Sequence, residues 1–487
     1  MTESTSSVEL LIGGKWVPAR AGTTVTTYVS GTEDPIASVA AADVDDVDDA
    51  VAAAVQAQAA WGSTSPGQRR EILERAAQLL LERSDTIATS IAREMGATFG
   101  FCQMNIYASV GYLKEAAAQT YEMVGEVVPS DVPGLTSLAV RQPAGVTVGI
   151  APWNAPLVLG VRAVAMPLAY GNTVILKASE QTPVTQAEIA RVLHDAGVPA
   201  GAIGLITNAP DKAPQIVERL VSHPDVRRIN FTGSTRVGRI IAELAGKHLK
   251  RVLLELGGKA PLLVLKDASI DDAVAATAFG AFMNQGQICM STERVLVAKE
   301  VVDEFSQKLA AAVSAMTVGD PLDPRTQIGP MVHAKAADHV ESLIQNAVDL
   351  GAEVLAGGER DGLFVKPTVL RGVTPKMRIY HEESFGPVAS IIEVSTEDEA
   401  IEIANDTPYG LASALFTNDL SKALELSKRI SAGVCHVNGP TLQDDPLMPF
   451  GGVKDSGYGR FGARASLDEF TELRWITLQA GSRSYPG

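Results

Sequence analysis

Hydrophobic positions recur at helical spacing over much of the first quarter of the chain. From Asp43 an aspartate, an acidic first turn and an alanine-rich continuation are typical of a capped helix. Residues 66–96 then repeat apolar side chains every three or four positions, which predicts further helix. The first 125 residues are therefore expected to be mainly helical.

Beyond residue 144 the pattern changes to short apolar runs that alternate with helical stretches. Four such runs occupy residues 145–151, 173–179, 226–233 and 251–258. This alternation is typical of βαβ units around a parallel sheet. A second series follows, with the apolar runs 260–265, 294–300 and 433–438, a helix-like segment at 271–285 and a long helix from Val301. We expect an α/β protein with a Rossmann-like domain followed by a second α/β domain.

Two segments fit neither series. Residues 121–145 and 469–479 alternate polar and apolar positions in the manner of strands, but they lie outside the βαβ pattern. Strands at the periphery of a domain often pair with another subunit. These segments are interpreted as a small bridging region.

Composition narrows the classes of protein. The chain of 487 residues has 41 basic and 57 acidic residues and a formal charge of −16, without a basic run that could follow a phosphate backbone. Nucleic-acid and membrane-surface binding are therefore not expected. No apolar stretch approaches the roughly 20 residues that cross a bilayer, and the N-terminus lacks the pattern of an export signal, so we expect a cytoplasmic protein.

The chain has three cysteines, Cys102, Cys289 and Cys435, which are too few for a disulfide framework. None lies in a spacing that suggests zinc, and no metal site is predicted. A free cysteine is most often a small buried hydrophobe, which is the interpretation for Cys102 and Cys435. Cys289 differs because it lies in "NQGQICMSTE", among amides, a glycine and small hydroxyl residues.

Several polar side chains follow predicted strands, at the sheet edge where open α/β sheets bind ligands. In "INFTGSTRVG" a strand runs into Gly233 and Ser234 before a helix, which favours a phosphate, although an ordinary turn has the same pattern. "TVILKASE" ends a strand with Lys177 and Glu180, which could bracket a ribose or form a solvated ion pair. A carboxylate at this position would repel a 2′-phosphate, which favours NAD over NADP.

Two further strand ends carry candidate catalytic groups. Glu255 in "LLELGGKAP" could act as a general base or could be an ordinary turn glutamate. Asn154 in "IAPWNAP" could donate its amide to an oxyanion or could cap the next helix.

The ordered motifs "PWN", "FTGST", "LELGGK", "NQGQIC", "EESFGP" and "PFGG" resemble those of the aldehyde dehydrogenase superfamily over essentially the whole chain. The longer stretches "AFMNQGQICMSTER" and "CHVNGPTLQDDPLMPFGG" are similar to the bacterial aromatic members that act on salicylaldehyde, vanillin or benzaldehyde. The resemblance implies a non-acylating dehydrogenase that forms the free acid. A broad-specificity aliphatic or semialdehyde dehydrogenase is the alternative.

The resemblance also implies roles for individual residues. Cys289 would attack the aldehyde and carry the acyl group as a thioester, and Glu255 would activate water to release the acid. Asn154 and the Cys289 N–H would stabilise the oxyanion. The cofactor is expected to be NAD, with NADP possible, and its contacts would be Ile150, Trp153, Lys177, Glu180, Gly233, Ser234, Glu383 and Phe385.

Three residues bear on the substrate. Ala155 is small where many relatives have an aromatic residue, so it would leave room for a ring near the thiol. Arg162 could hydrogen-bond a ring substituent or form a structural salt bridge, and Tyr458 could touch the substrate.

The resemblance further implies a domain division and an oligomer. Residues 1–121 and 144–256 would form the cofactor domain, 257–453 the catalytic domain, and 122–143 with 454–487 the bridging region. Since the bridging strands extend a partner's sheet in relatives, a homodimer or homotetramer is expected.

Overall fold

The structure is a computed structural model that describes residues 6–485. Its first sheet contains eight strands, and the five at the centre are parallel. One antiparallel strand flanks this centre on each side, and a further strand pairs antiparallel with the flanking strand on one side. In spatial order the strands are β22 (Gly457–Tyr458), β12 (Arg251–Glu255), β11 (Val226–Thr232), β8 (Val146–Ile150), β9 (Val174–Lys177), β10 (Ile203–Ile206), β2 (Leu10–Ile12) and β3 (Lys15–Val17).

The order of the central strands creates a switch point between β8 and β11. The chain adds β9 and β10 on one side of β8, then returns to place β11 and β12 on the other side. In open α/β sheets, ligands bind where the strand order reverses, outside the carboxyl ends of the strands. The segments that follow β8 and β11 are therefore positioned to line a binding crevice.

Helices cover both faces of this sheet, so its central strands are buried on both sides. One face packs against α1 (Val44–Ser63), α7 (Ala213–Ser222) and α8 (Thr235–Lys247). The other packs against α2 (Pro66–Glu82), α3 (Ser84–Met95), α4 (Phe99–Gln119), α5 (Pro156–Ala169) and α6 (Pro183–Ala196). The predicted cap of the first helix is confirmed, because the Asp43 side chain accepts from the backbone N–H groups of Asp45 and Asp46.

The expectation that the first 125 residues are mainly helical was wrong for their first third. Short strands precede α1, namely β1 (Ser6–Val8), β2, β3, β4 (Thr24–Tyr28) and β5 (Pro35–Ala40). Three of them form a separate sheet in the order β1-β5-β4, and β2 joins the edge of the first sheet by pairing with β10. Strands of three to six residues carry little periodic signal, because their stability comes from partners distant in sequence.

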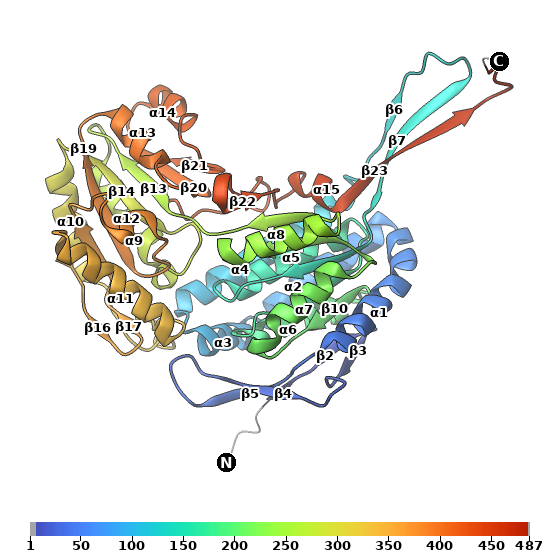
Figure 1. Cartoon of the computed structure of the whole chain (residues 1–487), viewed down its shortest axis with the longest axis horizontal. Coiled ribbons are helices and arrows are strands. Elements are labelled where there is room, and N and C mark those ends of the chain that lie inside the picture. Colours follow the sequence, from blue (N-terminus) through green and yellow to red (C-terminus); the bar gives the residue numbers. More distant parts are fainter. Residues whose placement is uncertain (1–5, 486–487) are drawn as a thin grey trace.

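A second sheet of seven strands forms the other half of the molecule (Figure 1). Its order is β15 (Glu353–Ala356), β18 (Thr368–Arg371), β19 (Val388–Val394), β14 (Thr292–Ala298), β13 (Ala260–Val264), β20 (Ala412–Phe416) and β21 (Val434–Val437). All neighbours are parallel except the edge pair β15 and β18. The predicted α/β class with a Rossmann-like sheet and a second α/β unit is confirmed.

Helices also cover both faces of the second sheet. One face carries α9 (Ile270–Phe282) and α10 (Val302–Ser314). The other carries α11 (Ala334–Asp349), α12 (Arg378–His381), α13 (Glu397–Asn405) and α14 (Leu420–Ser427). The remaining elements are the single-turn helices η1 (Pro210–Lys212), η2 (Met283–Gly286) and η3 (Lys454–Ser456), the helix α15 (Ala465–Phe470) and the hairpin of β16 (Arg360–Asp361) and β17 (Phe364–Val365).

The two peripheral segments form a projecting arm. β6 (Glu126–Val128), β7 (Leu135–Pro143) and β23 (Thr471–Gln479) make an antiparallel sheet in the order β23-β7-β6. Figure 1 shows this sheet extending away from the two larger units. The predicted strands are confirmed, whereas the domain boundaries and the pairing with another subunit stay predictions. β22 lies in the predicted bridging region but extends the first sheet.

Candidate active site

Cys289 lies in a loop between η2 and β14, and an unusual backbone shapes this loop. Asn284, Gln285 and Gly286 have φ values of 52°, 56° and 69°, so three consecutive residues are left-handed. Side chains fix the loop, because the Asn284 amide donates to the Asn154 carbonyl at 3.0 Å and the Gln285 amide donates to the Pro330 carbonyl at 3.0 Å. Strained backbone of this kind persists only where many surrounding contacts hold it in place, and it is found most often at functional sites.

Glu255 is the last residue of β12, and its side chain is fully buried. Its Oε2 lies 3.1 Å from Arg162 Nη2 on α5, and Arg162 Nη1 in turn lies 3.6 Å from Asp444 Oδ2. Tyr112 on α4 donates its hydroxyl to Asp444 at 2.6 Å. The guanidinium is held between the rings of Phe450 and Phe461, at 4.7 Å and 4.6 Å from their centroids.

Burial and charge set the acidity of these groups. Burial raises the pKa of Glu255, and the nearby Arg162 guanidinium opposes this shift. Burial and the adjacent Glu255 carboxylate raise the pKa of the Cys289 thiol well above its usual range, and Arg162 again acts in the opposite direction. Apart from the Cys289 thiol, no group among the described residues is positioned to donate a hydrogen bond to Glu255 Oε1. The thiol is therefore the group that can give its proton to this oxygen.

Asn154 lies beyond the end of β8, and its buried side chain faces the same site. Its Nδ2 donates to the Gln287 carbonyl at 3.0 Å, which orients the amide towards the loop of Cys289. In the part of the chain that the structure describes, the Cys289 N–H donates to no acceptor. The two N–H donors expected to stabilise an oxyanion thus lie on neighbouring segments.

An apolar cavity of about 260 Å³ opens beside the thiol. Cys289, Asn154 and Arg162 contribute to its wall together with Asn105, Gln443 and Asp444. The rest of the wall is apolar and comprises Phe101, Met104, Ala108, Ala155, Val158, Leu159, Phe279, Ile288, Met290, Leu442 and Phe450. Two predicted tunnel residues, Ala155 and Arg162, therefore line the cavity.

Tyr458 has a different position from the one expected for a tunnel residue. It lies on β22, opposite Leu254 of β12, and it is 51% exposed. It is not among the residues that line the cavity next to Cys289. The prediction that Tyr458 touches the substrate therefore has no support in this geometry.

The predicted cofactor residues of the first sheet lie at or beyond the carboxyl ends of the strands around the switch point. Lys177, the last residue of β9, forms an ion pair with Glu180. Asn208 donates to Glu180 Oε1 at 2.9 Å, and its own buried Oδ1 has no partner among the described residues. An ammonium, a carboxylate and an unsatisfied amide oxygen suit the hydroxyls of a ribose.

Gly233 and Ser234 follow β11 on the other side of the switch point. Ser234 caps α8, since its Oγ accepts from the Val237 N–H at 3.4 Å. The helix N-terminus has the orientation that favours a phosphate. A side chain at Gly233 would place its Cβ 2.4 Å from the Phe231 ring, so glycine permits the close packing of this turn.

The remaining predicted cofactor residues are Glu383, Phe385, Trp153 and Ile150. Glu383 Oε1 accepts from the Gly258 N–H at 2.8 Å, and a Cβ at Gly257 would lie 2.7 Å from Glu383 Oε2. Burial, and next the charge of Glu293, raise the pKa of Glu383 to about 8. Trp153 and Phe385 meet edge to face at 5.8 Å between ring centroids. Ile150, the last residue of β8, is buried.

Together these residues fit a nicotinamide dinucleotide. The helix N-terminus after Gly233, the Lys177 and Glu180 pair, and the buried Glu383 carboxylate offer partners for a pyrophosphate and for two riboses. Next to the Lys177 and Glu180 pair, the buried Asn208 Oδ1 has no hydrogen-bond partner among the described residues, which fits an acceptor for a ligand hydroxyl.

The other two cysteines lie away from this chemistry. Cys102 is buried on α4, and burial raises its pKa to about 12. Cys435 is half-buried on β21. Within residues 6–485 no group of three or more His, Cys, Asp or Glu side chains could hold a metal ion. No described helix is long and apolar enough to cross a membrane.

Sequence reasoning missed Tyr112, Gln443 and Asp444. The two neighbours Gln443 and Asp444 lie in "CHVNGPTLQDDPLMPFGG", but no pattern within that stretch indicates which side chain faces the cavity. Tyr112 lies at an apolar position of the helical pattern of α4, so the sequence predicts an ordinary core residue there. Only the tertiary contact with Asp444 distinguishes it.

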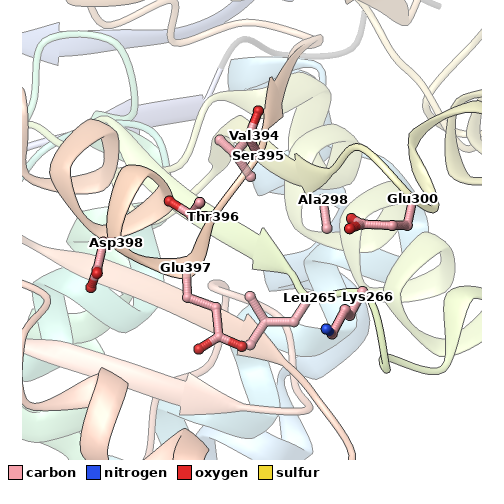
Figure 2. Close-up of a pocket in the computed structure, with 9 residues that line it drawn as sticks. All are labelled: Leu265, Lys266, Ala298, Glu300, Val394, Ser395, Thr396, Glu397 and Asp398. Atoms are coloured by element: carbon pink, nitrogen blue, oxygen red, sulfur yellow. The ribbon is translucent and has the colours of Figure 1, made fainter.

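A second pocket opens at the far end of the second sheet. Figure 2 shows Leu265, Lys266, Ala298, Glu300 and residues 394–398 around it, all at or beyond the carboxyl ends of β13, β14 and β19. Cys289 precedes β14, whereas Ala298 ends it. Because a strand of this length spans roughly 20 Å, this pocket is remote from the thiol.

Comparison with known proteins agrees with this geometry. Residues 16–476 match the aldehyde dehydrogenase family. A vanillin dehydrogenase of Pseudomonas sp. (strain HR199 / DSM 7063) is 52% identical over 98% of this chain and 99% of its own length. A salicylaldehyde dehydrogenase of Pseudomonas sp. (strain C18) is 42% identical over 98% of this chain and 99% of its own.

Solved structures give the same result. The crystal structure of a salicylaldehyde dehydrogenase from Pseudomonas putida G7, complexed with salicylaldehyde, matches with a TM-score of 0.97 and 41% identity over 99% of this chain and 100% of that one. An E. coli NADP dependent enzyme (33% identical, covering 99% and 100%) and an NAD-dependent aldehyde dehydrogenase from Sinorhizobium meliloti (35% identical, covering 99% and 96%) both have TM-scores of 0.95.

This chain belongs to the aldehyde dehydrogenase family. It is therefore an enzyme that oxidises aldehydes, and its cofactor is a nicotinamide dinucleotide.

Proposed function

We propose that this enzyme uses NAD to oxidise an aromatic aldehyde to the free carboxylic acid through a thioester on Cys289. The observation that carries the proposal is the apolar cavity beside the thiol, whose wall has three phenylalanines and small side chains at Ala108 and Ala155. An aromatic ring buries its apolar faces in such a wall. The names of the most similar relatives support the same substrate class.

The first chemical step is attack by Cys289 sulfur on the carbonyl carbon. Glu255 accepts the thiol proton as the carbon–sulfur bond forms, because the thiol is positioned to donate to this carboxylate, whose pKa is raised. The carbonyl oxygen becomes an oxyanion, which accepts hydrogen bonds from Asn154 Nδ2 and the Cys289 N–H. When bound, a nicotinamide cofactor supplies the hydride acceptor for the oxidation.

The second step is hydrolysis of the thioester. Glu255 first releases the thiol proton to solvent. It then accepts a proton from a water molecule, whose oxygen attacks the acyl carbon, and it passes this proton to the sulfur as the carbon–sulfur bond breaks. The sulfur leaves as the thiol after protonation, and the product is the carboxylic acid. Arg162 keeps the buried Glu255 oriented and favours its ionised form. A family member with this carboxylate in place is suited to hydrolysis rather than to transfer of the acyl group.

NAD is the proposed cofactor because Glu180 stands at the ribose position. Its carboxylate would repel a 2′-phosphate, and it already neutralises Lys177, the cation that could otherwise bind that phosphate. Similar structures include both NAD- and NADP-dependent enzymes, so the fold itself permits either.

The alternative substrates are aliphatic aldehydes and semialdehydes. A semialdehyde brings a second carboxylate, which needs a cation. Arg162 is the one cation among the residues that line the cavity, and both of its terminal nitrogens face carboxylates, Glu255 and Asp444. The charge of this site therefore disfavours semialdehydes.

The arm supports a homo-oligomer as part of the proposal. β23 is an edge strand, and three of its apolar side chains, Leu473, Trp475 and Leu478, are between 57% and 75% exposed. Edge strands with exposed apolar side chains are prone to pair with another chain. A monomer in light-scattering measurements would contradict this part of the proposal.

The substrate proposal is tested by steady-state kinetics with vanillin, salicylaldehyde, benzaldehyde, a short aliphatic aldehyde and succinic semialdehyde. The account expects higher kcat/KM for the aromatic set and no activity in Cys289→Ala. If the aliphatic aldehydes were preferred, the chemistry would stand and the substrate class would be wrong.

A further inference from the structure

Asp444 places a carboxylate in the wall of an otherwise largely apolar cavity. Asp444 lies in the loop after β21, and its side chain is 23% exposed. It contacts one terminal nitrogen of Arg162, while Glu255 contacts the other. The mechanism above uses Glu255 and leaves Asp444 without a chemical role. A carboxylate beside an apolar substrate site needs a reason, because desolvating it without a hydrogen bond is costly.

Three other polar groups of the cavity wall, those of Asn105, Arg162 and Asn154, are already engaged within the protein. Gln443 also lines the wall, but no side-chain hydrogen bond among the described residues holds its amide in place. The Asn105 amide donates to the Phe101 carbonyl and its oxygen accepts from the Val158 N–H, both at 3.4 Å. The two terminal nitrogens of Arg162 face Glu255 and Asp444. The Asn154 amide is directed at the loop of the thiol, where the oxyanion forms.

Asp444 differs because only one of its oxygens is used. The Tyr112 hydroxyl and Arg162 Nη1 both approach Oδ2, at 2.6 Å and 3.6 Å. Among the described residues no hydrogen-bond donor reaches Oδ1. Tyr112 and Arg162 also hold the carboxylate in place, so Oδ1 is a positioned acceptor rather than a mobile one. An ionised carboxylate accepts hydrogen bonds and does not donate them.

We infer that Asp444 Oδ1 accepts a hydrogen bond from a hydroxyl group on the substrate ring, so that the enzyme selects phenolic aldehydes. This inference rests on the proposed function and narrows its substrate class. A hydroxybenzaldehyde supplies the donor that the carboxylate lacks. Benzaldehyde and methoxybenzaldehyde cannot donate, so they leave a desolvated carboxylate oxygen unpaired, and a carboxybenzaldehyde adds repulsion between like charges.

The test measures a preference ratio. It is the kcat/KM of the best of the three hydroxybenzaldehyde isomers divided by the kcat/KM of benzaldehyde. Any effect of a substitution through Arg162 and Glu255 acts on both substrates and cancels in this ratio. We expect the wild-type ratio to exceed about 10, and the methoxybenzaldehydes to behave like benzaldehyde, because a charge-assisted hydrogen bond is worth a factor of that order or more.

Asp444→Ala removes the acceptor and is expected to lower the ratio by about 10- to 100-fold. Asp444→Asn keeps the size of the side chain and removes the charge, so it should give an intermediate ratio and serves if the alanine variant does not fold. The matched control is Asp445→Ala, because Asp445 is the adjacent aspartate, its side chain accepts from the Leu447 N–H at 2.9 Å, and it does not line the cavity. It should leave the ratio within about twofold of wild type.

A ratio that is near one in the wild type, or that stays within about twofold in both Asp444 variants, would overturn the inference. Such a result with good turnover of aromatic aldehydes would leave the proposed function intact. Absence of turnover with every aromatic aldehyde, while aliphatic aldehydes react, would instead show that the proposed function has failed.

Discussion

Arg162 Nη2 lies 3.1 Å from Glu255 Oε2, and both side chains are almost completely buried. The pair joins α5 to the end of β12 and places Glu255, the proposed general base, next to Cys289. A buried carboxylate without this partner would tend to take up a proton. Arg162 therefore connects the packing of the cavity wall with the protonation state that catalysis requires.

Replacing Arg162 by methionine should move the acid limb of the pH profile of kcat to higher pH. Burial already raises the pKa of Glu255, and the substitution removes the cation that opposes the shift. Glu255 must be deprotonated to act as a base. The pH at which kcat falls to half on the acid side should therefore rise by about one to three units. Arg191→Met is the matched control, because Arg191 lies over the Trp16 ring at 5.0 Å and outside the cavity. An unshifted acid limb in Arg162→Met would show that this ion pair does not set the ionisation of Glu255.

Replacing Asn154 by alanine should lower kcat by about 10²- to 10³-fold, because one of the two donors to the oxyanion is lost. The fold should tolerate the change, since the Asn284 amide donates to the main-chain carbonyl of residue 154, which alanine retains. Steady-state kinetics and a thermal unfolding curve separate the two effects. A loss of activity that merely followed a loss of folded protein would argue against the oxyanion role.

The sequence predicted four central strands of the first sheet and the strands β13, β14 and β21 of the second, but it missed β10, β19 and β20. The candidate catalytic residues could be proposed because they lie in continuous motifs. The sequence could not predict the partners of those residues. Arg162 and Glu255 are 93 positions apart, and Tyr112 and Asp444 are 332 apart. Such contacts exist only after the helices pack on the sheet. The strands β1 to β5 were missed for a similar reason, because three to six residues have too few positions to show a period.

Glu180→Gln should lower the preference for NAD over NADP. The substitution removes the carboxylate that would repel a 2′-phosphate, and it frees Lys177 to bind that phosphate. The ratio of kcat/KM for NAD to kcat/KM for NADP should fall about tenfold, which corresponds to ~1.4 kcal/mol. A matched control is Glu188→Gln, since Glu188 lies on α6 and pairs with Arg191. An unchanged ratio in Glu180→Gln would remove Glu180 from the cofactor site.

Glu383 should make the apoenzyme less stable as pH rises. Its pKa is about 8 in the folded protein against an ordinary 4.5, so between these values the folded state binds the proton more tightly than the unfolded state does. The free energy of unfolding therefore falls as pH rises through this window. Glu383→Gln cannot ionise, so relative to wild type it should be more stable at about pH 9 than at about pH 5.

Denaturant unfolding of both proteins at the two pH values measures this difference. Burial also raises the pKa of other carboxyls, for example that of Glu94 to about 7. These groups are present in both proteins, so their effect on the free energy of unfolding cancels in the difference. A difference that does not change with pH would show that Glu383 is ionised in the folded apoenzyme across this range.

The central claim is that Cys289 carries the acyl group of an aromatic aldehyde and that Glu255 releases it. The most direct measurement is intact-protein mass spectrometry of Glu255→Gln after mixing with vanillin and NAD, with Cys289→Ala as the control. The mixing is done at about pH 9, because without the Glu255 carboxylate that raises its pKa the thiol can lose its proton to solvent there and still attack the aldehyde. The account predicts a mass increase of one vanilloyl group per subunit, located on the peptide that contains Cys289 and absent in the control. No adduct, together with undiminished release of vanillic acid by Glu255→Gln, would contradict it.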